Sequence, residues 1–391
     1  MIALGLGVVE GGVAGVVVKS AFVDEVSGFV LNLTVAMVTG ATAFANVCSF
    51  LWASLSTGRS KVKTVMALQF ASATSLLLAG LAPISAVGLV VFVCGVVLAR
   101  LFWSGVVTVR SSIWRANYAR GWRALIAARM AIIVSLATAV AGVATGIVLQ
   151  LDPTKYSLAF PVAALLIIVG ALFYSRVRMR GEKRLIEAEQ HMVGRHSAIS
   201  PRQLFRILSE DSLYRRYLLC MFVFGSGNLM VAATLVVIMA EQLGLGVFQQ
   251  ILITASIPIV TIPLSVSFWG RRLDRMHIVR FRAYHAWVYV LAIAILASGA
   301  ISGLTPLLWL GAAVLGTGLA GGRLGWNLGH NDFAPAYLAT HYMGLHVTLT
   351  GIRGLFAPFI GVLFYHWLEL IQPGYGRHAL LLPLALAMLG A

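Results

Sequence analysis

Long apolar runs alternate with short polar segments along the whole chain. Most runs hold about 20 residues or more, which is the length of helix that crosses the roughly 30 Å hydrocarbon core of a bilayer. The twelve runs lie at about 2–22, 28–54, 63–83, 85–108, 124–149, 157–175, 217–240, 248–269, 283–302, 306–324, 339–366 and 379–391. The last run is short for a span, so either it is cut short or its helix crosses less deeply. The pattern predicts an all-α polytopic membrane protein with 12 transmembrane helices.

The composition supports a membrane protein and excludes a soluble protein and a nucleic-acid-binding protein. Hydrophobic residues make up 60% of the chain and charged residues 11%, whereas about a quarter of a soluble protein is charged. The net charge of +16 does not indicate a nucleic-acid-binding protein, because the Lys and Arg residues lie in alternate loops between spans. The three cysteines all lie inside apolar runs and form no disulfide or metal-binding pattern. We expect no cofactor and no metal.

The basic loops predict the orientation. Nearly all Lys and Arg follow the second, fourth, sixth, eighth and tenth runs, and basic loops stay on the cytoplasmic side. Both termini are therefore expected in the cytoplasm, with the chain crossing the cell's inner (plasma) membrane many times. The longest polar stretch, 176–216, separates residues 1–175 (the N-terminal half) from residues 217–391 (the C-terminal half), each predicted to be a six-helix bundle.

The stretch 176–216 itself is predicted to contain an amphipathic helix. Ser200-Pro201 has the residue types of a helix start, and apolar and charged positions alternate after it. Such a helix either lies on the cytoplasmic membrane surface or is a solvated linker.

The loop 270–282 has the most distinctive motif. Gly270 is followed four residues later by Asp274 and Arg275, and Arg280 comes next, all between two membrane-length runs. This resembles the cytoplasmic loop signature of the major facilitator superfamily, roughly G-x-x-x-D-R/K-x-x-x-R/K. An ordinary basic loop is the alternative. The resemblance implies that these four residues belong to a cytoplasmic gate.

The corresponding loop of the first half matches the signature poorly. Ala53 and Thr57 stand where the motif has Gly and Asp, although Gly58, Arg59 and Lys61 keep its basic end.

The resemblance to the superfamily also implies a function. It implies two parallel six-helix pseudo-repeats, a substrate site between them, and a monomeric secondary transporter that moves a small molecule by alternating access. Proton coupling, substrate identity and the direction of transport stay open, and membrane lipids are the other expected partner. The alternatives are a non-transporting membrane scaffold and a membrane-embedded lipid-modifying enzyme. We expect no enzymatic activity; no GxxxxGK[ST] phosphate-binding motif is present.

Two charges lie deep in the predicted spans of the N-terminal half. Glu10 lies in the middle of the first run and Arg100 in the inner half of the fourth. A charge inside a bilayer costs several kcal/mol unless it is paired or hydrated, which makes such residues candidates for function. By analogy with the superfamily the two face each other across the cavity, with Glu10 binding a proton or cation. The alternatives are a structural ion pair and an Arg100 that extends to the interface.

A second group lies in the eleventh run. His346, Thr350 and Arg353 are spaced i, i+4 and i+7, so they share one helix face. Together they form either an anion site or a proton relay, or they hydrogen-bond to the second or eighth span and lock the C-terminal half.

Further polar residues complete the candidate sites. A weak repeat at an offset of about 215 residues aligns the segment containing Asn117 with the one containing His330 and Asp332, and we expect all three at the cytoplasmic gate. His330 and Asp332 have no further metal-ligand residue types near them. Asn228, in the seventh run, either faces the cavity or joins two helices.

Overall fold

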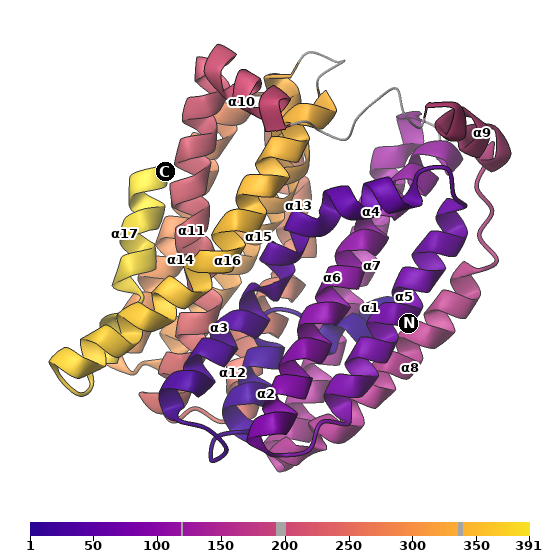
Figure 1. Cartoon of the computed structure of the whole chain (residues 1–391). Helices are drawn as coiled ribbons and strands as arrows, with labels where there is room; N and C mark the ends of the chain where they lie inside the picture. The colour runs from indigo at the N-terminus through magenta and orange to yellow at the C-terminus, as the bar shows by residue number, and fades with distance from the viewer. Residues whose placement is uncertain (119, 193–200, 335–338) are drawn as a thin grey trace.

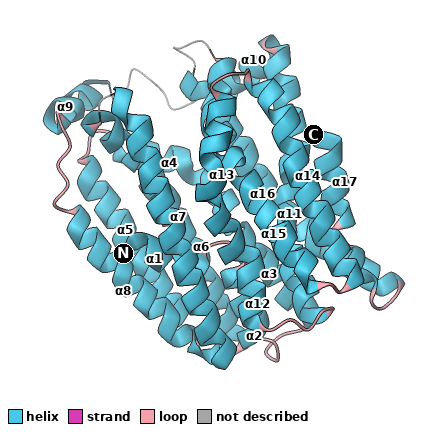
Figure 2. Ribbon diagram, turned by 180° about the vertical axis from the view of Figure 1, so that it is seen from behind, coloured by secondary structure: helices cyan, strands magenta, loops and turns pink. Residues whose placement is uncertain are grey.

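The computed structural model describes residues 1–118, 120–192, 201–334 and 339–391. Within these residues the fold consists of helices and connecting loops, with no strand (Figure 2). The predicted all-α polytopic class is therefore confirmed. The N-terminal half, indigo to magenta, lies beside the C-terminal half, orange to yellow, and α9 and α10 lie at one end of the molecule (Figure 1).

The helices follow the predicted runs closely. The N-terminal half contains α1 Ile2–Leu6, α2 Val13–Ala21, α3 Gly28–Phe44, α4 Ser49–Ser56, α5 Lys61–Gly80, α6 Ala86–Asn117, α7 Arg120–Leu151 and α8 Tyr156–Tyr174. The connecting stretch contains α9 Glu182–Met192 and α10 Pro201–Glu210. The C-terminal half contains α11 Ser212–Glu241, α12 Val247–Ile251, α13 Ile257–Leu273, α14 Ile278–Ser302, α15 Thr305–Leu328, α16 Ala339–Ile371 and α17 Leu381–Gly390.

Polar residues between the runs start several of these helices. The side chains of Ser27, Ser60, Ser85 and Asp211 each accept a hydrogen bond from a backbone N–H in the first turn of the helix that follows. Such caps satisfy donors that a helix start leaves without a partner. The helix α10 begins at Pro201, within the stretch where an amphipathic helix was predicted, and Ser200 lies outside the described residues. The helix α9 was not predicted.

Ten of the described helices are long and apolar enough to cross a membrane, and the bent pair α1–α2 makes an eleventh candidate. The helix α17 has 10 residues, too few for an ordinary span. Twelve spans thus remain a prediction. Large apolar side chains cover the outside, such as Leu264 at 81% and Leu370 at 85% exposure, as expected for a surface in contact with lipid.

The first span is broken, which corrects the prediction of one continuous helix over 2–22. A 3₁₀ turn at Gly7–Val9 and extended backbone at Glu10 separate α1 from α2, whose axes differ by 50°. Gly11 has φ +57°, a left-handed conformation that side-chain-bearing residues rarely adopt. A Cβ there would also lie 2.7 Å from the carbonyl oxygen of Thr254. The Gly11-Gly12 pair therefore allows both the break and the close approach of the other half.

The two halves meet where α3, α7 and α2 of the first pack on helices of the second. The helix α3 packs on α16 and α11, α7 on α12 and α13, and α2 on α11 and α12. Glycines allow the closest contacts, as where Gly354 of α16 lies against Phe44. Opposite Gly12, a π-helical turn at Leu252–Ser256 interrupts the eighth span, a feature frequent at functional sites.

Candidate functional site

Glu10 and Arg100 form an ion pair within the N-terminal half, where the first span breaks. One guanidinium nitrogen of Arg100 donates to both the Glu10 carboxylate and the carbonyl oxygen of Val9. The break leaves that carbonyl without an i+4 partner, so Arg100 satisfies it. The Arg100 side chain is 4% exposed, whereas the Glu10 side chain is 26% exposed. The predicted pairing is present, and the carboxylate is its accessible member.

His346, Thr350 and Arg353 do share one face of α16, and their hydrogen bonds lead to α11 and α15. Arg353 donates to the carbonyl oxygen of Met221 on α11 and to the Thr350 hydroxyl at 3.0 Å. The Thr350 hydroxyl also accepts from the indole N–H of Trp326 on α15, at 3.2 Å. The alternative prediction of hydrogen bonds to the second or eighth span does not hold among the described residues.

Two further arginines lie near this face, and neither was singled out from the sequence. Arg282 of α14 is 7% exposed and donates to the carbonyl oxygen of Gly322 on α15, at 3.4 Å. Arg323 of α15 is exposed and lies within electrostatic range of Glu10, across the boundary between the halves. Tyr289 lies within electrostatic range of Arg282, Arg323 and Arg353. Arg282 was missed because α14 begins five residues before the predicted run; Arg323 lay inside a predicted run, near its end.

A second polar cluster joins the halves at the end of the molecule away from α9 and α10. Lys19 of α2, 7% exposed, forms an ion pair with Glu241 at the end of α11. The same carboxylate accepts from the Asn32 amide at 2.8 Å and from the Tyr365 hydroxyl at 2.6 Å, and Asn32 also contacts His366 at 3.2 Å. These five residues are called the Lys19 cluster below. The sequence suggested only loop positions for Lys19 and Glu241, because residues 222 positions apart give no local signal.

A further hydrogen bond joins the halves at this end. The Gln150 side chain accepts it from the backbone N–H of Phe248 at 3.0 Å. The Lys19 cluster and this hydrogen bond are thus polar links between the two halves.

At the opposite end, the predicted gate residues Asn117 and Asp332 hydrogen-bond to segments that lie next to them. Asn117 donates to the carbonyl of Arg178 at 2.9 Å and accepts from the backbone N–H of Arg180 at 3.0 Å, so it ties α6 to the connecting stretch. Asp332 accepts from the backbone N–H of Ile278 at 2.7 Å and so caps α14. His330 is half-buried, and burial lowers its pKa, so it is neutral at pH 7. The structure does not join Asn117 to this pair by any hydrogen bond between described residues.

The loop signature itself lies at the surface. Asp274, Arg275 and Arg280 are exposed and have no ion pair among the described residues, and Gly270 lies near Leu324. At this loop, the carboxylate that caps the start of α14 belongs to Asp332.

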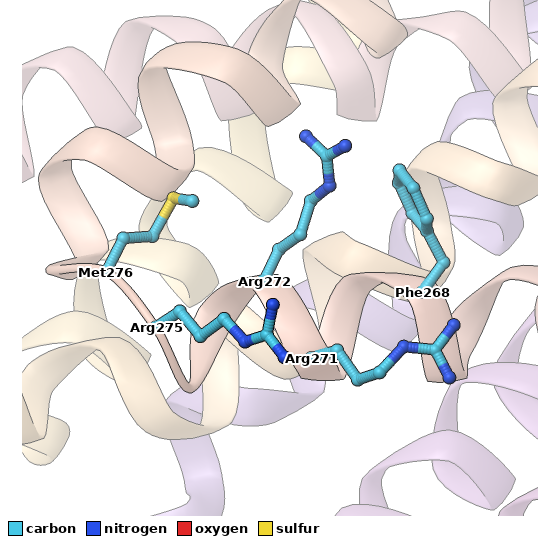
Figure 3. Close-up of a pocket in the computed structure, with 5 residues that line it drawn as sticks. All are labelled: Phe268, Arg271, Arg272, Arg275 and Met276. Atoms are coloured by element: carbon cyan, nitrogen blue, oxygen red, sulfur yellow. The ribbon is translucent and has the colours of Figure 1, made fainter.

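A surface pocket of about 360 Å³ lies at the same end of α13. It is lined by Phe268, Arg271, Arg272, Arg275 and Met276, and Arg272 rises beside the Phe268 ring (Figure 3), 4.5 Å from its centroid. This pocket belongs to the basic loop and not to the boundary between the halves.

In the first half, α9 contacts the loop that lacks the motif's Asp. Lys61 is 3% exposed and pairs with Glu189 of α9 at 2.7 Å, and the same carboxylate accepts from the backbone N–H of Gly58 at 2.7 Å. The connecting stretch thus supplies the carboxylate that the degenerate signature does not have.

The last candidate, Asn228, lies in α11. Its side-chain oxygen is buried without a hydrogen-bond partner among the described residues. Its two predicted roles, facing the cavity or joining two helices, stay predictions.

Comparison with known proteins gives a family and a fold. The family profile described as Major Facilitator Superfamily matches residues 2–358. The solved structure of a D-xylose-proton symporter is 13% identical with a TM-score of 0.69, covering 100% of this chain and 95% of that one. The nucleoside transporter NupG is 12% identical with a TM-score of 0.70, covering 100% and 98%. A POT family transporter in complex with a thioalcohol-conjugated peptide is 11% identical with a TM-score of 0.68, covering 100% and 93%. No curated protein sequence matches the chain.

Proposed function

Because this chain belongs to the major facilitator superfamily, we propose that it is a secondary active transporter that moves a small solute by alternating access. The observation that carries the proposal is the meeting of ionisable groups from both halves inside the bundle. Glu10, 26% exposed and paired with Arg100, lies within electrostatic range of Arg323 from the other half. A site built from both halves is the kind that a rocking motion exposes to each side in turn.

The arrangement of contacts supports a state closed at one end. The Lys19 cluster and the Gln150–Phe248 hydrogen bond hold the halves together there. We place residues 176–216 and both termini in the cytoplasm of a cell with the protein in its plasma membrane, because this stretch is densely basic. The conformation is then closed on the outside.

Glu10 is the proposed coupling group. Its proton uptake would break the ion pair and leave Arg100 bonded only to the Val9 carbonyl. A guanidinium without a counter-charge is unfavourable in a low dielectric, so protonation of Glu10 would favour a rearrangement of the N-terminal half. Proton binding at Glu10 and movement of the halves would be linked through this pair.

The test is flux into proteoliposomes that contain the purified full chain. A panel of radiolabelled sugars, amino acids, nucleosides, carboxylates and organic cations is offered with and without a pH gradient. The proposal requires saturable, protein-dependent uptake of at least one solute; a gradient-dependent rate supports proton coupling. Uptake of no solute above that of protein-free vesicles would instead favour a membrane scaffold.

A further inference from the structure

The interior of the bundle has more positive than negative charge. Four arginines lie within helices of the bundle, namely Arg100 in the N-terminal half and Arg282, Arg323 and Arg353 in the C-terminal half, and the three of the C-terminal half lie within electrostatic range of Tyr289. Of the 13 acidic residues, only Glu10 lies in the interior of a predicted membrane-spanning run. Glu10 is already paired with Arg100. Three guanidinium groups of the C-terminal half therefore have no carboxylate of their own.

The hydrogen bonds of Arg282 and Arg353 do not neutralise them. Their partners are the carbonyl oxygens of Gly322 and Met221 and the Thr350 hydroxyl, all uncharged. In addition, the Nε atoms of both side chains are buried without any partner among the described residues. An arginine has five N–H donors, so each retains both charge and donors for an anion.

Arg323 is placed to contact a ligand first. Its side chain is exposed although it lies in a membrane-length helix, and no hydrogen bond or ion pair holds it among the described residues. It lies within electrostatic range of Glu10 on the opposing half and of Tyr289 in its own half. Arg323 therefore projects toward the space between the halves.

Aromatic side chains lie beside these arginines. Trp326 follows Arg323 by three residues and so shares its helix face, and its ring lies 5.9 Å from that of His346. Tyr289 lies within electrostatic range of the three arginines. An aromatic surface next to cationic groups suits a solute that has an organic body and an anionic group.

We propose that the transported solute is an organic anion, with its carboxylate or phosphate group bound by Arg323 and Arg353 and its organic body against Trp326 and Tyr289. This inference rests on the proposed transport function and adds the substrate class. Bidentate hydrogen bonds from guanidinium to carboxylate or phosphate supply the recognition. Arg282 does not contact the solute in this proposal, but its charge adds to the positive electrostatic potential at the site. The alternative, that the arginines only join helices, predicts no preference for charge.

The test compares solutes that share a skeleton and differ in charge. Thermal unfolding of the purified full chain in detergent is followed with succinate against succinamide, benzoate against benzamide, glucose 6-phosphate against glucose, and choline alone. We expect saturable stabilisation by at least one anion and none by its neutral counterpart, and exchange of that same anion in proteoliposomes. Stabilisation by none of the anions, or equally by the neutral partner, overturns the inference.

Variants locate the site. Arg323→Gln should weaken binding of the stabilising anion about 10- to 100-fold, the range expected for loss of a charged hydrogen bond, and Arg323→Lys should lose less. The control is Arg206→Gln, an exposed arginine of α10, which should bind as the unmodified chain does. Unchanged binding in Arg323→Gln would overturn the proposed location.

The two proposals fail in different ways. Gradient-dependent transport of a neutral or cationic solute alone keeps the transport function and overturns the anion site. Anion binding without exchange in vesicles keeps the anion site and overturns the transport function.

Discussion

The interior arginines of the two halves have different hydrogen-bond partners. In the N-terminal half, Arg100 lies against the carboxylate of Glu10 and the carbonyl of a broken helix. In the C-terminal half, Arg353 and Arg282 bond to neutral oxygens only, and Arg323 has no bonded partner among the described residues. A buried pair whose members neutralise each other is suited to a proton-driven change, whereas arginines without counter-charge are suited to binding an anion.

The comparison also shows what helix geometry contributes. Glu10 reaches Arg100 only because Gly11 and Gly12 break the first span, and Arg353 has room because Gly225 faces it without a side chain. Small residues in both halves thus create the positions at which charge is tolerated inside the bundle.

The largest expected effect comes from removing the carboxylate. Glu10→Gln leaves Arg100 without a counter-charge and without a proton acceptor beside it, so we expect proton-driven uptake to fall by about 100-fold or more, consistent with loss of an essential proton-transfer group. Uptake with and without a pH gradient in proteoliposomes measures this. Glu25→Gln, at a loop position, is the matched control. Full gradient dependence in Glu10→Gln would remove Glu10 from the coupling role.

The difference between the arginines predicts unequal losses of stability. Arg100→Met should destabilise the fold by about 3–5 kcal/mol, because it strands the Glu10 carboxylate. Arg353→Met should cost no more than about 1.5 kcal/mol, since it removes hydrogen bonds to neutral groups together with an uncompensated charge. Thermal unfolding in detergent ranks the two variants. Equal losses of stability in the two variants would show that the Glu10 carboxylate does not make Arg100 differ from Arg353.

The Lys19 cluster should influence conformation more than folding. Glu241→Gln removes the ion pair with Lys19 and keeps one oxygen, which can accept from Asn32 or from Tyr365 but does not replace both carboxylate oxygens. We expect the free energy that holds the halves together at this end to fall by about 1–2 kcal/mol. The conformational equilibrium then shifts roughly 5- to 30-fold toward the state open at this end. A cysteine at Val18, buried in the closed state, reports this shift through its labelling rate in a chain lacking the native cysteines. An unchanged rate would leave the cluster without a gating role.

The smallest effect is expected in the connecting stretch. Glu189→Gln weakens the pair with Lys61, whose partner carboxylate is 24% exposed, so the cost should be about 1 kcal/mol or less. Limited proteolysis should cleave the stretch after residue 192 at a faster rate, while transport stays near that of the unmodified chain. Arg206→Gln, which affects an exposed pair, is the control.

Apolar run length and charge position were enough to predict the fold class, because bilayer thickness determines helix length. Glu10, Arg100 and the α16 face were found from the sequence since charges inside apolar runs are conspicuous. The Lys19 cluster could not be found, as Lys19, Glu241 and Tyr365 come from distant segments at helix ends. Arg282 was missed because the predicted boundary placed it in a loop. The first span's break was hidden because Gly11 and Gly12 fit an apolar run as well as a turn.

The central claim, that the two halves must separate during transport, is tested most directly by linking them. A Cβ at Gly146 of α7 would lie 3.5 Å from the Cβ of Ile251 of α12, within the roughly 3.5–4.5 Å range of disulfides. In a chain whose native cysteines are replaced by alanine, Gly146→Cys/Ile251→Cys is oxidised, and exchange of the transported solute is measured before and after reduction, with each single variant as control. The account predicts that oxidation stops exchange and that reduction restores it. Undiminished exchange with the disulfide fully formed would contradict it.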